Sequence, residues 1–486
     1  MMNYKDDSLM LHTDLYQINM METYFRDGIH QRKAIFELYF RKIPFGNGFA
    51  VFAGLERIVE YMRDFRFTNN DIDFLRENVG YEEDFLQYLQ NLTFSGSIYS
   101  MQEGELVFAN EAILRVEAPI AEAQLIETAL LNIVNYQTLI ATKATRMKQV
   151  IGEQTAMEFG TRRAQELDAA IWGTRAAYIG GFSATSNVRA GKKFGIPVAG
   201  THAHALVQAY QDEYKAFKKY ASSHKQCVFL VDTYDTLRSG VPNAIRVADE
   251  FGDKIKFQAI RLDSGDLSYL SKRAREMLDE AGYKDTKIIA SNDLDEYTIM
   301  NLQAQGAKID IWGIGTKLIT AYDQPALGAV YKLVCMEDAN GEMQDTIKIS
   351  GNPEKISTPG EKRIYRIINR ENHHAEGDYV TLAGEEMNMQ RLKMFHPIHP
   401  YISKFVTNFE AVELHHPVIT DGQIVYEQIP LEEIQLKVKS NLELLWNEYK
   451  RTLNPEEYPV DLSEACWENK RKSIEEVQSK LQGIKE

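Results

Sequence analysis

Short apolar segments alternate with helical stretches through the middle of this chain, at intervals of roughly 20 to 40 residues. Such alternation predicts βα units and, with them, a parallel sheet or barrel. It assigns the chain to the α/β class. The predicted strands are 156–159, 177–180, 196–199, 227–231, 256–260, 287–290 and 309–312.

Polar residues or glycines follow every predicted strand at once. The loops are 160–163, 181–186, 200–204, 232–235, 261–266, 291–293 and 313–317. Because the carboxyl ends of the strands of an α/β barrel meet at one rim, loops that are distant in sequence assemble one site there. We therefore predict a single site built from these loops.

The length of the chain predicts about two or three domains. We expect a mixed α+β domain over 1–140, the α/β barrel over 141–345, and a C-terminal segment over 346–486 that packs on the first domain and carries terminal helices. Within the flanks, the patterns predict an amphipathic region at 69–79, an apolar helix around 121–139, a strand at 363–368 and charged helices at 430–446 and 462–481.

The charge balance narrows the class of partner. The chain has 55 Lys and Arg against 70 Asp and Glu, a formal charge of −15, which argues against nucleic acid. Small anions remain possible, because clustered arginines and helix N-termini can hold phosphate inside an acidic protein. Three widely spaced cysteines indicate neither disulfides nor a zinc knuckle, and no apolar stretch is long enough to span a bilayer. We expect a cytoplasmic protein.

Two histidines mark the loop Gly200-Thr201-His202-Ala203-His204, which ends an apolar strand and precedes a predicted helix. A helix N-terminus favours phosphate, and neutral imidazole is a good nucleophile, general base or phosphoryl acceptor near neutral pH. The alternative is an ordinary hydrogen-bonded histidine at a strand end.

Glycines mark the loop Gly313-Ile314-Gly315-Thr316, where backbone amides can approach an anion without interference from side chains. The spacing to Lys317 is too short for a Walker motif, and a bare turn is the alternative. Because the last loops of a barrel commonly hold phosphate, we predict phosphate binding here.

Arginine and carboxylates follow two neighbouring predicted strands. Arg261 can clamp a carboxylate or phosphate, while Asp263 and Asp266 can hold Mg²⁺ through water or accept bonds from ribose hydroxyls. A surface salt bridge is the alternative. Of Asp232 and Asp235, we expect one to serve ribose or metal and the other to cap a helix.

Phe159 and Tyr16 can sandwich a flat heteroaromatic ring, with Arg162 close enough to meet an anionic substituent. Aromatic residues are more often part of the core, so these two gain meaning only from their neighbours.

Five of these segments together resemble the nicotinate phosphoribosyltransferase family. They are 13–17, 158–163, 200–204, 261–266 and 313–317, and they follow the order of the family from about residue 8 to about residue 370. The resemblance implies a type II phosphoribosyltransferase fold, an irregular open α/β barrel beside a mixed domain built from both chain ends. It implies transfer of phosphoribosyl from phosphoribosyl pyrophosphate to nicotinate in NAD salvage, with ATP as co-substrate and Mg²⁺ as cofactor.

The resemblance also implies residue roles. His204 matches the phosphorylated histidine, whereas His202 occupies a variable position and is expected to be either a bystander or a residue that supports the site without touching the substrate. The implied assembly is a homodimer with shared active sites, in which Tyr16 of the partner subunit stacks on the pyridine ring against Phe159. Ala205 departs from the family, where many relatives have serine. The predicted catalytic residues are His204, Asp263 and Asp232, and the predicted substrate-binding residues are Tyr16, Phe159, Arg162, Ser186, Thr201, Arg261, Ser291, Asn292, Gly313, Gly315 and Thr316.

Ser186 bears on the choice of substrate. The related nicotinamide enzyme has an aspartate at the similar position, where a carboxylate would repel nicotinate, so an uncharged hydroxyl favours the acid.

Other functions remain open on the sequence. A nicotinamide or quinolinate phosphoribosyltransferase is the nearest, although quinolinate needs a more basic pocket than Arg162, Arg163 and Arg261 provide. A sugar-phosphate aldolase or isomerase on a regular eight-stranded barrel would use Lys317 as a Schiff-base lysine. The last alternative function is that of a noncatalytic ligand-binding protein.

Overall fold

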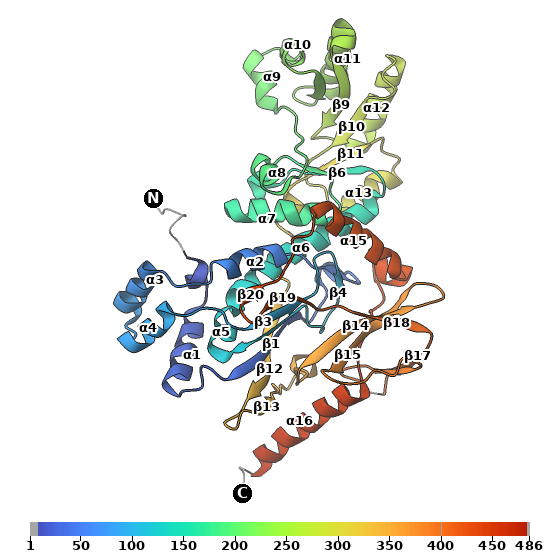
Figure 1. The fold of residues 1–486 in the computed structure, drawn as a ribbon. Coiled ribbons are helices and arrows are strands. Elements are labelled where there is room, and N and C mark those ends of the chain that lie inside the picture. The colour runs from blue at the N-terminus through green and yellow to red at the C-terminus, as the bar shows by residue number, and fades with distance from the viewer. Residues whose placement is uncertain (1–7, 400, 484–486) are drawn as a thin grey trace. The chain divides into compact units, whose positions relative to one another are not determined.

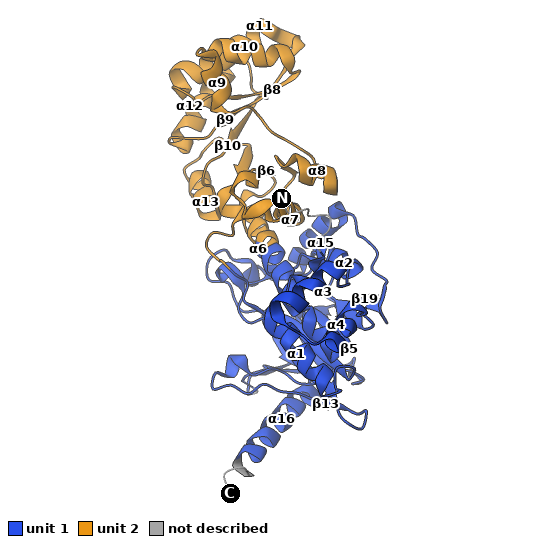
Figure 2. Cartoon of the chain, turned by 90° about the vertical axis from the view of Figure 1, so that its left-hand side faces the viewer, with its two compact units in different colours: residues 1–139, 326–486 blue, residues 140–325 orange. Residues whose placement is uncertain are grey.

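A computed structural model of the chain describes residues 8–399 and 401–483. The internal contacts divide the chain into two compact units (Figure 2). Unit 1 combines 1–139 with 326–486, and unit 2 is 140–325. Both ends of the chain therefore belong to one unit, and the middle forms the other.

Unit 2 is built on an open sheet of six parallel strands in the order β7-β6-β11-β10-β9-β8 (Figure 1). The strands are β6 (Thr155–Glu158), β7 (Ala184–Thr185), β8 (Gln226–Leu230), β9 (Lys256–Leu262), β10 (Lys287–Ala290) and β11 (Ile311–Ile314). This curled, open parallel sheet confirms the predicted α/β fold class. The middle strands read as apolar runs because helices cover both faces of such a sheet.

The register of the sheet brings the strand ends together. Ile314 at the end of β11 lies opposite Glu158 at the end of β6, and Ala290 of β10 lies opposite Leu262 of β9. Because the strands are parallel, the loops that follow them leave from one edge of the sheet.

The helices of unit 2 connect these strands. They are the end of α6 (Glu127–Ile151), α7 (Glu166–Ile179), α8 (Val188–Phe194), α9 (His204–Tyr210), α10 (Glu213–Ser223), α11 (Val241–Phe251), α12 (Leu267–Glu280), α13 (Glu296–Ala304) and α14 (Thr316–Ile319), with short turns η4 (Thr161–Arg163), η5 (Thr236–Gly240) and η6 (Gly252–Lys254). Several of the polar residues that follow strands act as side-chain caps. Asp235 accepts from the backbone of η5, Asp266 caps α12 and Asp295 caps α13.

Two predicted strands of this unit are wrong in part or in full. Segment 177–180 is the end of α7, which is buried from Ala170 to Ile179 and therefore lacks the polar face that would distinguish a helix in the sequence. The strand that follows α7 is β7, and four residues separate the two elements. Segment 196–199 contributes only one bridge, from Val198 to Thr185. The other five predicted strands overlap observed ones.

Unit 1 contains a seven-stranded antiparallel sheet in the order β13-β12-β1-β5-β3-β19-β20. Its strands are β1 (Lys33–Phe40), β3 (Ser97–Ser100), β5 (Leu114–Pro119), β12 (Ala329–Glu337), β13 (Met343–Asp345), β19 (His416–Thr420) and β20 (Gln423–Ile424). Three strands from the N-terminal part of the chain, β1, β5 and β3, thus lie between strands from its later part.

A second, six-stranded sheet of unit 1 comes from the C-terminal part of the chain, in the order β17-β16-β21-β15-β14-β18. Its strands are β14 (Lys362–Asn369), β15 (Ala375–Leu382), β16 (Leu392–Phe395), β17 (Ser403–Val406), β18 (Phe409–Glu413) and β21 (Val460–Leu462). The strand predicted at 363–368 lies within β14. The other five strands of this sheet were not predicted from the sequence.

The remaining elements of unit 1 are mostly helical. They are α1 (Leu15–Arg26), α2 (Leu55–Arg63), α3 (Asn69–Phe74), α4 (Glu83–Gln90), α5 (Ile120–Leu125), the start of α6, α15 (Leu431–Leu444) and α16 (Glu464–Gly483), with η1 (Leu9–Leu11), η2 (Pro44–Gly46), η3 (Leu75–Val79), η7 (Pro353–Lys355), η8 (Asn447–Lys450) and the pair β2 (Ala50–Val51) and β4 (Leu106–Val107). The predicted helices at 121–139, 430–446 and 462–481 correspond to α5 with α6, α15 and α16.

Arg366 fastens the second sheet of unit 1 to the N-terminal part of the chain. This buried guanidinium bonds both carboxylate oxygens of Asp378 at 2.8 and 3.0 Å and also reaches Glu105 and the Leu106 carbonyl. Because it is surrounded by partners, the buried charge is compensated. Nowhere in 8–399 or 401–483 does a helix combine the length and apolar character that crossing a membrane requires.

Candidate active site

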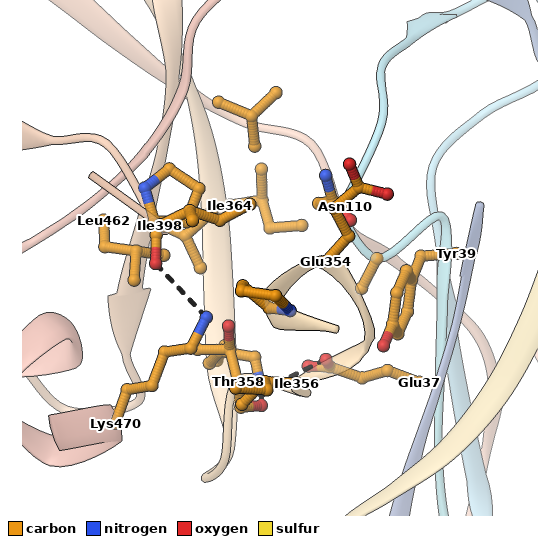
Figure 3. A pocket seen from close by; sticks show the side chains of 16 residues that line it. Glu37, Tyr39, Asn110, Glu354, Ile356, Thr358, Ile364, Ile398, Leu462 and Lys470 are labelled. Atoms are coloured by element: carbon orange, nitrogen blue, oxygen red, sulfur yellow. Dashed lines mark hydrogen bonds and ion pairs between the residues drawn. The ribbon is translucent and has the colours of Figure 1, made fainter. Parts of the chain in front are cut away.

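A small pocket of unit 1 is lined by Glu37, Thr358 and Lys470, among other residues (Figure 3). Lys362 Nζ lies 3.1 Å from Glu37 Oε2, and Lys470 Nζ donates to the Pro397 carbonyl at 3.3 Å. The cavity measures about 40 Å³, which holds a few water molecules at most. It is too small for a metabolite, so we place the candidate site elsewhere.

Unit 2 has a cleft of about 610 Å³ along the edge where the loops leave the sheet, a volume typical of small-molecule sites. It is lined by loops after β6, β7, β9, β10 and β11 and by the segment 198–203. Of the predicted site residues, the cleft is lined by Phe159, Arg162, Ser186, Thr201, Arg261, Asp263, Ser291, Asn292, Gly313, Gly315 and Thr316.

Three predicted residues lie outside this lining. His204 and Asp232 are next to the cleft, joined to it through Asp263. Tyr16 belongs to unit 1, where it is exposed near the start of α1.

His204 begins α9 and has a neighbour at each ring nitrogen. Its Nδ1 lies 3.0 Å from Thr233 Oγ1. Its Nε2 lies 3.9 Å from Asp232 Oδ1 and 4.0 Å from Asp263 Oδ2. The side chain is 38% exposed, so an incoming group can reach the ring.

Asp232 and Asp263 form a connected pair of carboxylates. Asp232 Oδ2 accepts from the Asp263 N–H at 2.9 Å and from the Ser264 hydroxyl at 2.6 Å. Asp232 Oδ1 is buried without a hydrogen-bond partner in the described part of the chain, and it points toward His204. A buried acceptor of this kind is costly unless a ligand or ion satisfies it. Asp263 in turn accepts from the Ser291 hydroxyl.

Asp235, three residues after Asp232, has the other expected role. Its carboxylate accepts from Leu237 N at 3.1 Å and Arg238 N at 2.8 Å, which caps the turn η5. In this loop Asp232 therefore lies beside His204. Asp235 caps η5, as was expected of one of the two aspartates.

Arg261 joins two loops at the floor of the cleft. Its Nη1 donates to Thr201 Oγ1 at 2.6 Å, and its Nη2 lies 3.8 Å from Asp263 Oδ1. Burial lowers the pKa of the Arg261 guanidinium, and Asp263 and Asp232 partly offset this effect. The side chain is thus a partly desolvated cation that faces the cleft, and such a cation suits recognition of an anion.

His202 holds the 200–204 loop in place by contacts within unit 2. Its Nε2 accepts from the Leu230 N–H at 3.2 Å, at the end of β8, and its ring packs near Phe217 and Tyr220. Burial lowers the pKa of this imidazole to about 4, so it is neutral at physiological pH. It fastens the 200–204 loop to the sheet.

Glycines let the Phe159 ring lie against β11. A Cβ on Gly313 would lie 2.6 Å from Phe159 Cε2, and one on Gly315 would lie 3.0 Å from the Phe159 carbonyl oxygen. The Phe159 N–H also donates to the Ile314 carbonyl at 2.7 Å. The glycine loop is therefore required by close packing against the aromatic residue, in addition to any role toward phosphate.

Glu158, within the segment 158–163, supports the site, a role that was not predicted from the sequence. Its buried carboxylate accepts from the Thr185 and Thr174 hydroxyls at 2.6 and 3.0 Å and from the Gly160 N–H. Burial raises the pKa of this carboxyl, while these hydrogen bonds lower it. A charged residue at the end of the apolar strand β6 was the signal that could have found it.

The loop after β10 contains a strained backbone. Asn292 has a φ of +92°, and its side-chain oxygen accepts from the Asp293 N–H at 3.1 Å. Non-glycine residues rarely adopt this conformation, and such strain is often found at ligand sites.

Lys317 forms an ion pair with Asp295. Its Nζ lies 2.6 Å from Asp295 Oδ2, and Tyr322 donates to the same oxygen at 3.1 Å. Burial alone would raise the pKa of Asp295, but the bond from Lys317 and those from Thr298 lower it to about 2. The open six-stranded sheet contradicts the regular eight-stranded barrel of the Schiff-base alternative.

Sequence comparisons match three family models along the chain. Residues 11–135 match the nicotinate phosphoribosyltransferase N-terminal domain, 155–363 match the nicotinate phosphoribosyltransferase family, and 361–470 match the C-terminal domain. Together these ranges cover most of both units.

Individual proteins agree with the family models. The chain is 70% identical to the nicotinate phosphoribosyltransferase of Bacillus subtilis, over 99% of this chain and 98% of the relative, and 38% identical to that of Dictyostelium discoideum, over 94% and 86%. The crystal structure of human nicotinic acid phosphoribosyltransferase superposes with a TM-score of 0.85 at 29% identity, covering 95% of this chain and 99% of that one.

Proposed function

The chain belongs to the nicotinate phosphoribosyltransferase family, and from this premise we propose that it couples ATP hydrolysis to nicotinate mononucleotide synthesis through a phosphorylated His204. The substrates are nicotinate and phosphoribosyl pyrophosphate, and the products include pyrophosphate. The observation that carries the proposal is the position of His204, exposed beside the cleft and bracketed by Thr233 and the Asp232 and Asp263 carboxylates.

The cleft offers complementary groups for nicotinate. The pyridine ring stacks on Phe159, and its carboxylate meets the partly desolvated Arg261 and the Thr201 hydroxyl to which Arg261 is bonded. Ser186 lines the same cleft with a neutral hydroxyl, which leaves the carboxylate unopposed.

The transfer breaks the bond between the ribose anomeric carbon and pyrophosphate and forms a bond from that carbon to the pyridine nitrogen. Its transition state is expected to resemble an oxocarbenium ion, as in glycosyl chemistry generally. No general base is needed, because the ring nitrogen of nicotinate carries no proton at neutral pH. The chain contributes alignment and charge: Phe159 positions the ring, and the backbone of 313–316 and Thr316 hold the phosphoribosyl group.

Mg²⁺ fits the carboxylate pair. The described residues contain no group of three or more His, Cys, Asp or Glu side chains that could hold a metal alone. Mg²⁺, however, usually binds one or two carboxylates together with substrate phosphates. The unpartnered, buried Asp232 Oδ1 and the neighbouring Asp263 are the residues that would hold it. When bound, the ion neutralises charge on the phosphates.

His204 supplies the coupling. Its imidazole attacks the terminal phosphorus of ATP, the bond from that phosphorus to the bridging oxygen breaks, and ADP leaves with the electron pair. The phosphoenzyme binds the transfer substrates more tightly, and hydrolysis of the phosphohistidine resets the cycle. Differential binding of this kind can drive an otherwise poorly favourable synthesis.

From the same family membership we propose that the enzyme acts in NAD salvage, as a homodimer in which the partner's Tyr16 stacks on the ring opposite Phe159. Tyr16 is 49% exposed on unit 1, as a residue that serves another subunit would be. The three cysteines are free and buried, which suits the reducing cytoplasm.

Two measurements on the purified protein test the proposal. Incubation with γ-labelled ATP is expected to give an acid-labile, alkali-stable phosphoryl enzyme whose label maps to His204. In the full reaction, ADP is expected to form with nicotinate mononucleotide in a fixed ratio. The proposal would be overturned if the label mapped to another residue. It would also be overturned if neither the rate nor the extent of nicotinate mononucleotide synthesis depended on ATP.

A further inference from the structure

We infer that Asp295 is a positioning residue for the 313–316 segment, which it holds through Lys317, the residue that follows the segment. This inference rests on the proposed function, because that function places the phosphoribosyl group at 313–316. It goes beyond that function by assigning a role in substrate binding to a residue that does not line the cleft.

Both carboxylate oxygens of Asp295 are engaged. Its Oδ1 accepts from the Thr298 N–H at 2.7 Å, which caps α13. Its Oδ2 lies 2.6 Å from Lys317 Nζ and accepts from the Tyr322 hydroxyl at 3.1 Å. Because Asp295 is only 3% exposed, these contacts form in a medium where electrostatic interactions are stronger than in water. The carboxylate therefore joins the loop after β10 to the residues that follow β11.

The 313–316 segment is held at both of its ends. At its start the segment belongs to β11, which pairs in parallel with β6. At its end Lys317 reaches Asp295, and the Lys317 ammonium also lies 5.0 Å from the centroid of the Tyr322 ring. The contact with Asp295 is therefore a side-chain tether at the second end of the segment.

The start of α13 is itself anchored. Glu296, the residue after Asp295, is fully buried, and its carboxylate lies 3.0 Å from Lys143 Nζ and 3.0 Å from Arg146 Nε, both on α6. Lys143 Nζ also lies 2.8 Å from Asp323. Because each of these charges has a partner of opposite sign, displacing one of them would leave another uncompensated. Asp295 therefore projects from a helix end that the packing of unit 2 fixes.

The ion pair also limits what Lys317 contributes to the cleft. Lys317 does not line the cleft, whereas Thr316 does, and the Lys317 ammonium is already compensated by Asp295. We therefore expect the phosphoribosyl group to meet the backbone of 313–316 and the Thr316 hydroxyl. On this account, Lys317 acts on the substrate through the place of the segment and not through its own charge.

The test compares the steady-state kinetics of three full-length variants. Asp295→Asn keeps an oxygen that can cap α13 and removes the charge that holds Lys317. Lys317→Met removes the ammonium and keeps a long apolar side chain, and the third variant carries both changes. Asp212→Asn is the matched control, because Asp212 caps α10 in the same way, by accepting from the Lys215 N–H at 3.0 Å, and is exposed.

We expect the KM for phosphoribosyl pyrophosphate to rise roughly 10- to 100-fold in Asp295→Asn and in Lys317→Met, because a displaced segment loses its alignment with the substrate. The KM for nicotinate is expected to change little, since Phe159 and Arg261 are untouched. The double variant is expected to be no worse than the single variants, because both changes remove one contact. Asp212→Asn is expected to match wild type.

Several results would overturn the inference while leaving the proposed function intact. One is an unchanged KM for phosphoribosyl pyrophosphate in Asp295→Asn. Another is an equal rise of the KM values for both substrates, which would indicate a general structural role. Effects that add in the double variant would show that Asp295 and Lys317 act separately. A far larger loss in Lys317→Met than in Asp295→Asn would assign the ammonium directly to the substrate.

Thr316→Val separates this inference from the proposed function, because it changes the cleft and leaves Asp295 and Lys317 in place. If its KM for phosphoribosyl pyrophosphate equalled that of wild type, the placement of the phosphoribosyl group under the proposed function would be wrong, and the inference would fail with it. Circular dichroism shows whether each variant is folded. If Asp295→Asn is unfolded, the calorimetric affinity of Lys317→Met for phosphoribosyl pyrophosphate decides, and an unchanged affinity overturns the inference.

Discussion

Arg261 Nη1 donates a 2.6 Å hydrogen bond to Thr201 Oγ1, across 60 residues of sequence. This contact fastens the loop that leads to His204 onto the end of β9. The guanidinium proposed to bind nicotinate therefore also supports the histidine proposed to react with ATP. A change at either residue is expected to be felt by both half-reactions.

Arg261→Lys tests this shared position. A lysine keeps the charge but loses the planar fork that reaches Thr201 and Asp263. Hydrogen bonds to charged groups contribute about 1.5–3 kcal/mol, so the KM for nicotinate is expected to rise roughly 10- to 100-fold. The exposed Arg273→Lys is the control. An unchanged KM in steady-state assays would show that Arg261 does not bind the substrate.

His204→Ala removes the proposed phosphoryl acceptor. We expect ATP stimulation of nicotinate mononucleotide synthesis to be lost and a slow, ATP-independent transfer to remain, because the groups that position the substrates are untouched. His224→Ala, a histidine bonded to the Tyr220 carbonyl, serves as control. Full ATP stimulation of His204→Ala would refute the role of this histidine.

Ser186→Asp places a carboxylate in the cleft beside nicotinate. Two like charges about 4 Å apart repel by about 1–4 kcal/mol, depending on the local dielectric. The kcat/KM for nicotinate is therefore expected to fall about tenfold or more relative to that for nicotinamide. Ser222→Asp, on an exposed helix, adds the same charge elsewhere. Equal ratios in wild type and Ser186→Asp would count against the argument.

Gly313→Ala puts a methyl group 2.6 Å from the Phe159 ring, so the ring must move. Because this ring is the proposed platform for the pyridine, the KM for nicotinate is expected to rise several-fold, with a smaller effect on the KM for ATP. Gly351→Ala, whose Cβ would meet nothing within 4 Å, is the control. Identical kinetics in both variants would contradict the packing argument.

His202 gives the protein a predictable response to acid. Its pKa is about 4 in the folded protein against about 6.5 in an unfolded chain, so below pH 6.5 the unfolded state binds the additional proton. The contribution of His202 to stability is therefore full above pH 6.5 and is lost as the pH drops toward 4, by roughly 3 kcal/mol.

His202→Gln keeps an acceptor for Leu230 but cannot titrate. Urea unfolding at pH 7 and pH 5 is expected to show a larger loss of stability in wild type than in this variant. The same loss in both would show that His202 does not govern the acid response in this range.

The sequence predicted the parts of the site that parallel topology brings together. Segment 287–290 coincides with β10, and the loops after β6, β9, β10 and β11 line one cleft because parallel strands end on one edge. Of the two aspartates in the loop after β8, Asp235 is confirmed as the expected cap, whereas the ribose or metal role of Asp232 stays a prediction.

Other features depended on packing that the sequence does not display. The apolar run at 177–180 is a helix end because α7 is buried on all sides there, which removes the periodicity that identifies a helix. The second sheet of unit 1 escaped prediction because β15 pairs in parallel with β21, about 80 residues later, an association that local patterns do not signal. Thr233 became visible only as a hydrogen-bond partner of His204.

A crystal structure of the protein with nicotinate mononucleotide tests the account most directly. We predict the pyridine ring on Phe159, its carboxylate at Arg261 and Thr201, and its phosphate at the 313–316 backbone. A nucleotide bound outside the unit 2 cleft, or bound in it with the carboxylate turned away from Arg261, would contradict the account.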